Sequence, residues 1–209
     1  HVRTKGYWDW SLLETPGGPG LSEVAIAENR IVGHYAVMRC QAVRSGQTLT
    51  IGLAVQAMMH KKYRNLQNIM ILTDRIWARC RETGVDLVYG FPNENIWTIN
   101  KRLMNWQQIE IFPALIRLGS TAPDGLIVDD AIQVTREYAA NHAFDDLWAR
   151  VKAHNHNCIS IIRDQNFVNW RFFNHPLQHY SVYTAWKDTE LKGYIVLKYF
   201  HSGDLYWGH

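Results

Sequence analysis

Residues 47–59 have the sequence QTLTIGLAVQAMM, in which apolar and β-branched residues predominate. A run of this length and composition predicts a long buried strand, around which the rest of the chain can be arranged. Gly52 lies inside the run and is expected to mark a bulge. The strand is expected to end where the basic turn from His60 to Arg64 begins.

After this turn the apolar spacing changes to that of a helix. Between Leu66 and Thr83 apolar residues recur at i, i+3, i+7 and i+11, which predicts an amphipathic helix. Its apolar face comprises Ile69, Leu72, Ile76 and Cys80. Gly84 supplies the C-terminal stop, and Val85–Phe91 reads as a short strand that ends at Pro92. We therefore expect two adjacent parallel strands joined by a right-handed helical crossover.

A hairpin is expected before the long strand. Its strands are Ser22–Ala27 and Arg30–Cys40, and its turn is Glu28-Asn29. A further helix is expected much later, at Phe144–His154. The order of elements, β-β-β-α-β-α-β, indicates a mixed α/β sheet.

Pro92 is followed by a second helical pattern. Asn93 or Asn95 can cap this helix, which is expected to run to about Asn105. Gln107–Leu118 then reads as a strand interrupted by a proline, which suits a sheet edge or a bulge. The best linker candidate is Gly119–Gly125, so we expect one domain over residues 1–120 and a linker, helix and partial second half over residues 121–209.

Part of the sequence recurs 160 residues downstream. Tyr7–Pro16 aligns without gaps onto Phe167–Pro176, and each copy contains a W-x5-P pattern that leads to a hairpin. The second hairpin is expected at Tyr180–Trp186 and Glu190–Phe200. The shared pattern favours a tandem duplication, although so few identities can also arise by chance. Because only a short stretch follows the second copy, the chain is expected to hold one whole unit and the opening of another.

Three stretches resemble the GNAT superfamily of N-acetyltransferases. Met58–Arg64 resembles the end of the family's fourth strand with its basic turn, and Gly84–Asn93 resembles its fifth strand with a Pro-Asn exit. The third stretch resembles the start of a second GNAT-like half in a tandem bacterial subgroup, through Arg163-Asp164, Trp170-Arg171 and His175-Pro176. The resemblance implies an α/β (α+β) fold, with a mixed, mostly antiparallel sheet, flanking helices and a splayed central parallel strand pair.

The resemblance also implies acetyl-CoA as cofactor. In the family, pantetheine lies between the splayed strands and the pyrophosphate sits on backbone N–H groups at a helix start. The family loop, Q/R-x-x-G-x-G/A, falls on Arg64–Ile69, where Gln67 and Ile69 replace the small residues that allow close approach. Acetyl-CoA binding is therefore expected to be weak or absent. The implied cofactor-binding residues are Met58, Met59, Arg64, Asn65, Leu66, Gln67, Asn68, Ile69, Asn93 and Asn95.

The family's catalytic groups are not matched. Acetyl transfer to an amine needs a base, often a glutamate on the fourth strand, and an acid, often a tyrosine on the later helix. No acidic residue occurs in Gln47–Met59, and Asn100 or Lys101 stands where the tyrosine would fall. His60 and Glu94 are the nearest titratable candidates, with a turn histidine and a first-turn helix acid as the alternative interpretations.

Composition narrows the function classes. The chain has 22 basic and 19 acidic residues, and no strong basic stripe, so no nucleic-acid partner is expected. No run is long and apolar enough to span a bilayer, and no signal peptide is visible. The three cysteines, Cys40, Cys80 and Cys158, lie far apart and suit a reducing cytoplasm. The histidines at 154, 156, 175 and 179 lack a spaced carboxylate or cysteine, so no metal site is expected.

Three functions remain open. The first is acyl transfer from coenzyme A to an amine of a small molecule or amino sugar. The second is a catalytically degenerate GNAT-fold module that binds a ligand or partner without turning over acetyl-CoA. The third, which the small net charge of +3 supports least, is a tandem acyltransferase that uses aminoacyl-tRNA.

Overall fold

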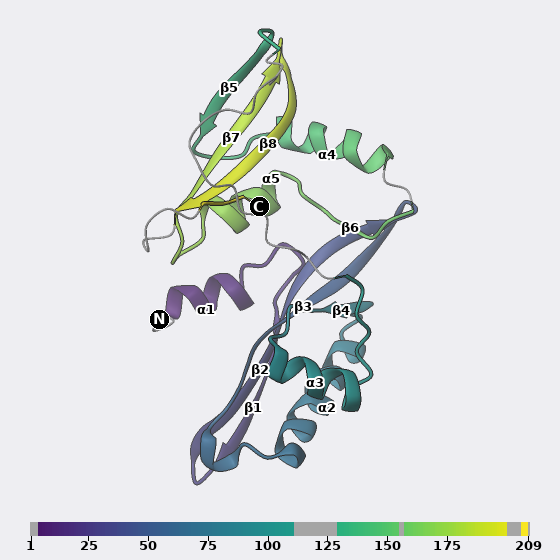
Figure 1. Ribbon diagram of the computed structural model, residues 1–209, viewed down its shortest axis with the longest axis vertical. Coiled ribbons are helices and arrows are strands. Elements are labelled where there is room, and N and C mark those ends of the chain that lie inside the picture. The colour runs from purple at the N-terminus through teal and green to yellow at the C-terminus, as the bar shows by residue number, and fades with distance from the viewer. Residues whose placement is uncertain (1–3, 111–128, 155–156, 200–205, 209) are drawn as a thin grey trace. The chain divides into compact units, whose positions relative to one another are not determined.

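The computed structural model describes residues 4–110, 129–154, 157–199 and 206–208 (Figure 1). The chain divides into two compact units, one formed by His1–Tyr89 with Ala131–His209 and the other by Gly90–Asp130. The domain boundary expected after residue 120 and the linker expected at Gly119–Gly125 lie outside the described residues.

The first unit contains a five-stranded mixed sheet. Its strand order is β1-β2-β3-β4, and β6 pairs with β2 beyond this path. The strands are β1 (Leu21–Ala27), β2 (Arg30–Arg44), β3 (Gln47–Met59), β4 (Leu87–Tyr89) and β6 (Ser160–Ile161). All pairs are antiparallel except β3 with β4, which are parallel neighbours. The predicted parallel pair and the mixed, mostly antiparallel sheet are both confirmed.

Tight turns join the first three strands. Glu28 and Asn29 have φ values of 50° and 59°, and Ser45 and Gly46 have 48° and 81°. Two successive left-handed residues match the right-handed twist of a two-residue hairpin. The hairpin expected around Glu28-Asn29 is therefore confirmed, with β2 running to Arg44 instead of Cys40.

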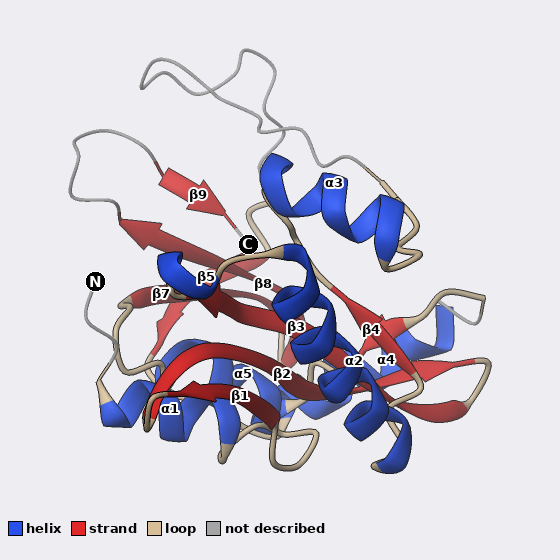
Figure 2. Cartoon of the chain, turned by 90° about the horizontal axis from the view of Figure 1, so that it is seen from below, coloured by secondary structure: helices blue, strands red, loops and turns tan. Residues whose placement is uncertain are grey.

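Helix α2 (Leu66–Glu82) covers one face of this sheet (Figure 2). Leu72, Ile76 and Cys80 of its expected apolar face are buried against the sheet. Their partners are Leu21, Tyr35, Val37 and Met59. Gly84 adopts φ 70° just after the helix, the left-handed conformation that a C-terminal cap requires.

Helix α1 (Lys5–Leu12) packs on the other face and was not expected from the sequence. Thr4 caps it by accepting a hydrogen bond from the Tyr7 N–H. Trp10 from this helix joins a second buried cluster with Trp170, which lies in η2 (Asn169–Phe173) just after α5 (Gln165–Val168). The cluster is completed by Met38, Cys40, Ala42 and Ile51.

A second, antiparallel sheet follows later in the chain. Its order is β5-β7-β8-β9, with β5 (Ile132–Glu137), β7 (Tyr180–Lys187), β8 (Glu190–Tyr199) and β9 (Tyr206–Gly208). Helix α4 (Ala143–His154), expected from Phe144, buries that phenylalanine against Val182 and Val196. Strand β5 was not expected, because its side chains are mostly exposed and polar.

The two hairpins share an irregularity at aligned positions. In the first the strand register shifts between Ala25 and Ile26, and in the second it shifts between Ala185 and Trp186. In both cases the alanine before the shift pairs with a glycine, Ala25 with Gly33 and Ala185 with Gly193. The aligned tryptophans, Trp10 and Trp170, are both buried.

Three elements differ from expectation. Strand β4 is shorter than Val85–Phe91, because the Val85 N–H still donates to the Cys80 carbonyl of α2. The helix after Pro92, α3 (Glu94–Leu103), ends before Asn105, which adopts φ 52°. Residues 107–110 form no strand, and the rest of the strand expected at Gln107–Leu118 lies outside the described residues.

Candidate functional site

Strands β3 and β4 stay paired over only three residues each. Ile51, Gly52 and Leu53 pair with Leu87, Val88 and Tyr89. Strand β3 then continues to Met59 with β2 on one edge and, within the described chain, without β4 on the other. Its backbone from Ala54 onward therefore offers hydrogen-bonding groups on that edge.

A bulge interrupts β3 inside this unpaired stretch. It lies opposite Tyr35, and Gln56 adopts φ 56°, a left-handed conformation that is uncommon for such a residue. The expectation that Gly52 marks the bulge is wrong, because Gly52 has regular partners on both sides. Gly52 is required instead by packing, since a Cβ there would lie 2.4 Å from Val37 Cγ1.

The turn after β3 places the start of α2. It consists of η1 (Lys61–Tyr63), followed by Asn65, whose side-chain oxygen accepts from the Asn68 N–H at 2.9 Å. Asn68 Nδ2 in turn donates to the Tyr63 carbonyl at 2.8 Å. Within the described part of the chain no bond is made by the N–H groups of Leu66 and Gln67, which remain at the helix end as donors for an anion.

The basic residues of this turn are largely engaged by the protein itself. Arg64 donates from Nε and from its terminal nitrogen to the Met59 carbonyl, at 3.1 and 3.0 Å. Lys62 Nζ lies 2.8 Å from a carboxylate oxygen of Glu28 and holds the pKa of that carboxyl below its usual value. Lys61 is exposed. The positive charge stays close to the helix start, but two of the three cations already have partners.

His60 caps η1 and is exposed. Its Nδ1 accepts from the Lys62 N–H at 3.2 Å, so the lone pair on that nitrogen is engaged. In the neutral ring Nε2 then carries the proton. This arrangement favours the turn-histidine interpretation over proton abstraction by His60.

The remaining candidates lie on α3, in the other compact unit. The Asn93 side chain caps that helix by accepting from the Ile96 N–H at 3.1 Å. Glu94 is the first residue of α3 and Asn95 the second. The structure thus brings Met58 through Ile69 together at the β3–α2 turn, and it leaves Asn93, Glu94 and Asn95 on a separate unit.

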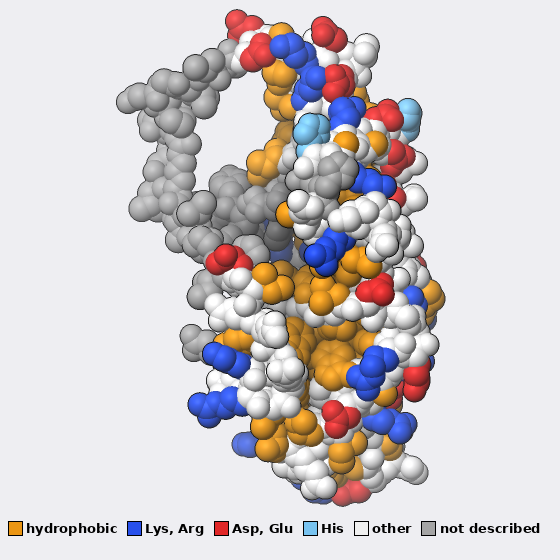
Figure 3. Space-filling model, turned by 90° about the vertical axis from the view of Figure 1, so that its right-hand side faces the viewer, with side chains coloured by type: hydrophobic (Ala, Val, Ile, Leu, Met, Phe, Trp, Pro, Cys, Tyr) orange, Lys and Arg blue, Asp and Glu red, His pale blue; other side chains and the backbone are white. Residues whose placement is uncertain are grey.

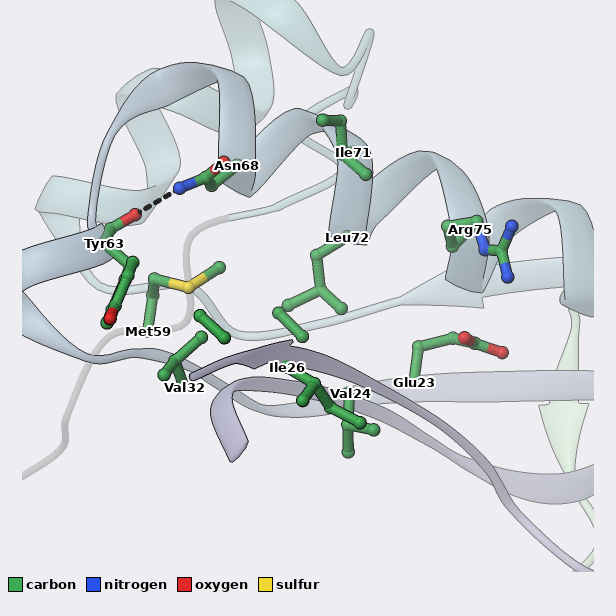
Figure 4. A pocket seen from close by; sticks show the side chains of 12 residues that line it. Glu23, Val24, Ile26, Val32, Met59, Tyr63, Asn68, Ile71, Leu72 and Arg75 are labelled. Carbon is green, nitrogen blue, oxygen red and sulfur yellow. Dashed lines mark hydrogen bonds between the residues drawn. The ribbon is translucent and has the colours of Figure 1, made fainter. Parts of the chain in front are cut away.

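A pocket of about 410 Å³ lies between β1 and α2, with β3 and η1 contributing at one end (Figure 4). Its walls are mostly apolar, and they include Met59 and Asn68 from the expected cofactor set. Glu23 in the pocket wall forms an ion pair with Arg79 at 3.0 Å. Strands β1 and β4 lie at opposite ends of the strand order, so the β1 wall of this pocket is not next to β4.

Sequence reasoning missed two polar features of this sheet. Gln56 has both side-chain polar atoms buried without a hydrogen-bond partner among the described residues. His34 is buried beneath the edge of the Trp8 ring and bonds to Ser22 and to the Gln56 carbonyl. The only sequence signal was a histidine inside an apolar strand, because these contacts depend on cross-strand register.

Other reactive groups are few in the described chain. Burial raises the pKa of the Cys40 thiol to about 11 and also raises that of Cys80, so neither is an activated nucleophile. Among the described residues no three His, Cys, Asp or Glu side chains cluster as metal ligands.

No described helix is sufficiently long and apolar to cross a membrane. On the face drawn in Figure 3, basic and acidic side chains are interspersed.

The chain resembles known proteins in its three-dimensional structure and not in its sequence. No protein-family model and no curated protein sequence matches the chain. A probable N-acyltransferase from Enterococcus faecalis is similar over 87% of this chain, with a TM-score of 0.58 and 11% identity, and the chain spans 45% of that protein. Glucosamine-6-phosphate N-acetyltransferase from Arabidopsis thaliana (TM-score 0.40, 13% identity) matches 46% of this chain and 66% of its own.

A predicted acetyltransferase from Clostridium acetobutylicum, solved with acetyl-CoA, matches 46% of this chain and 64% of its own (TM-score 0.41, 13% identity). The chain shares its fold with the Enterococcus faecalis protein, and the fold class that the resemblance implied is confirmed: a mixed, mostly antiparallel sheet with flanking helices and one parallel strand pair.

Proposed function

We propose that this chain is a GNAT-type acyltransferase that moves an acetyl or other acyl group from coenzyme A to an amine of a small molecule or amino sugar. The observation that carries the proposal is the end of the parallel pairing at Leu53 and Tyr89, beyond which β3 continues to Met59. Among the described residues, the β3 edge from Ala54 to Met59 has no strand partner on that side, and it is a backbone ladder to which the amides of pantetheine can pair.

The start of α2 supports the same reading. The N–H groups of Leu66 and Gln67 and the helix dipole suit a pyrophosphate, and Lys61 adds a cation nearby. The backbone N–H groups at the start of α2 therefore suit the pyrophosphate better than the side chains of this turn do. When bound, acetyl-CoA would supply an activated thioester, and this chain would orient it along β3 so that an amine can attack the acetyl carbon.

A second candidate is a GNAT-fold binding module that does not turn over acetyl-CoA. The observation in its favour is that two basic side chains already have partners within the protein. Arg64 donates to the Met59 carbonyl, and Lys62 donates to the Glu28 carboxylate. Gln67 and Ile69 also stand where the family has small residues. His60 and Glu94 remain our candidates for proton transfer in the enzyme.

Calorimetric titration with acetyl-CoA separates the two candidates. The unmodified protein should bind weakly and lose affinity with salt, because charge supplies most of the attraction. Replacing Gln67 and Ile69 together by glycine should tighten binding if their side chains obstruct the pyrophosphate. Gln67→Ala with Ile69→Val is the matched control, since it keeps branched bulk at position 69. Absence of binding by the glycine variant would favour the non-enzymatic module.

We also propose that the part of the chain after residue 160 is the opening of a second GNAT-like half, as in tandem members of the family. The shared register shift of the two hairpins and the buried Trp10 and Trp170 support a duplication. This chain spans 45% of the length of the Enterococcus faecalis protein.

A further inference from the structure

Ser22 on β1 and His34 on β2 form a hydrogen-bonded pair that acyl transfer from coenzyme A does not require. Ser22 Oγ lies 2.8 Å from His34 Nε2, and His34 Nδ1 lies 3.2 Å from the Gln56 carbonyl oxygen. A carbonyl oxygen only accepts, so Nδ1 carries the proton of the neutral ring. The Ser22 hydroxyl therefore donates a hydrogen bond to His34 Nε2, and the lone pairs of the Ser22 oxygen are directed away from the ring.

Strand register holds this pair together. Ser22 pairs with Ala36 and Val24 pairs with His34, so Ser22 and His34 are diagonal neighbours on one face of the sheet. The bulge at Gln56 brings its carbonyl to the other ring nitrogen. Trp8 packs edge-on against the imidazole, with ring centroids 4.9 Å apart, which fixes the ring plane. His34 is only 8% exposed, whereas Ser22 remains partly accessible.

The surroundings suit a small apolar acyl group. Val24 and Met58 flank His34 on the neighbouring strands and are 44% and 51% exposed. In the described part of the chain β1 pairs only with β2, and alternate residues of such a strand direct their N–H outward. The N–H of either Ser22 or Glu23 therefore faces outward from the sheet edge, as a backbone donor close in the chain to the Ser22 hydroxyl.

We propose that Ser22 is a nucleophile activated by His34, forming a covalent acyl ester from esters of small aliphatic acids. A bond forms between Ser22 Oγ and the acyl carbon while the hydroxyl proton moves to His34 Nε2. The ester C–O bond breaks, and the leaving alcohol takes that proton. Water then attacks the acyl carbon and gives its proton to His34, the carboxylic acid leaves, and Ser22 regains its hydroxyl proton from His34.

Reaction of the 209-residue protein with a fluorophosphonate tests this site without acetyl-CoA. Ser22 Oγ should form a bond to phosphorus with loss of fluoride, seen as a single adduct by intact mass and assigned by peptide mapping. Ser22→Ala should abolish the adduct. Ser160→Ala is the matched control, because Ser160 is also a partly exposed strand serine. His34→Gln should slow the labelling on the order of 10²-fold, since glutamine cannot take the proton.

Ser22→Cys gives an independent readout if His34→Gln does not fold, which thermal melting would reveal. Iodoacetamide should alkylate the new thiol at least about tenfold faster than the exposed Cys158 of the same molecule. Equal alkylation rates would overturn the proposal. So would an unlabelled Ser22 in the folded wild-type protein, or a fluorophosphonate adduct that survives Ser22→Ala.

Discussion

Trp10 and Trp170, which lie 160 residues apart, hold each other by two reciprocal hydrogen bonds. Trp10 Nε1 donates to the Trp170 carbonyl at 2.7 Å, and Trp170 Nε1 donates to the Trp10 carbonyl at 2.9 Å. Their rings stack at 4.9 Å with an angle of 15° between their planes, and each residue is at most 6% exposed. This pair fastens α1 to η2, so the start of the chain and its later part stabilise one another.

Removal of either ring should destabilise the whole unit. Trp10→Ala and Trp170→Ala should each lower the free energy of unfolding by about 3–5 kcal/mol, because each leaves a cavity and an unpaired buried carbonyl. The double variant should lose less than the sum, since both changes remove the same stack. Urea denaturation measures all three, and Leu13→Ala, an exposed position of the same segment, serves as control. Strictly additive losses would contradict direct coupling.

Gly52→Ala should strain the centre of the sheet. The added Cβ would lie 2.4 Å from Val37 Cγ1, so the strands must shift, at a cost of about 1–3 kcal/mol. In a Val37→Ala background the same Gly52→Ala change should cost less than it does in the wild type, because the clashing Val37 Cγ1 is absent. Gly193→Ala, in a strand where a Cβ meets nothing within 4 Å, is the matched control. Thermal melting showing equal effects at Gly52 and Gly193 would count against this packing.

Asp86 sets the start of the parallel pair. Its carboxylate accepts from the Thr50 N–H and its own N–H donates to the Thr50 carbonyl, both at 2.8 Å. Asp86→Ala should cost about 0.5–1.5 kcal/mol, because the exposed Thr50 N–H exchanges the carboxylate for water. Asp86→Asn keeps an accepting oxygen and should retain most of the stability. If denaturant midpoints of the two variants coincide, the side-chain bond does not hold β3 to β4.

His175 should make stability fall in mild acid. Burial, and then the nearby Arg171 and Lys198, lower its pKa to about 4, and its Nδ1 accepts from the Leu177 and Gln178 N–H groups. An unfolded histidine titrates near 6.5, so between about pH 6.5 and 4 the unfolded chain binds more protons. This contribution is fully present above about pH 6.5 and is lost as pH falls toward 4. His175→Gln should flatten the melting temperature profile in that window; an unchanged slope would contradict the assignment.

Sequence patterns predicted the elements that carry a clear local signal. The run before His60, the helical face through Ile76 and the turn at Glu28-Asn29 each carry a local signal, and the structure confirms the elements they predicted. Helix α1 was missed even though Thr4 is a suitable cap, because its apolar pattern is short. Strand β5 was missed because its side chains are mostly exposed and show no apolar pattern; what identifies it is its backbone pairing with β7.

The candidate site was harder to predict for a physical reason. The cap at Asn65 follows from local sequence, whereas the bulge at Gln56 depends on how β2 and β3 align. The bonds that engage Arg64 and Lys62 join groups whose approach only the folded chain fixes. His34 gained its partners from two other strands, so no local pattern could identify it.

Backbone hydrogen exchange with and without saturating acetyl-CoA tests the central claim most directly, because it reports where the cofactor lies. We expect new protection of amides in Ala54–Met59 on the open edge of β3, and of Leu66 and Gln67 at the start of α2. The β7–β8 hairpin should not change. Protection confined to other segments, or no change at a concentration where calorimetry shows binding, would contradict a cofactor site between β3 and β4.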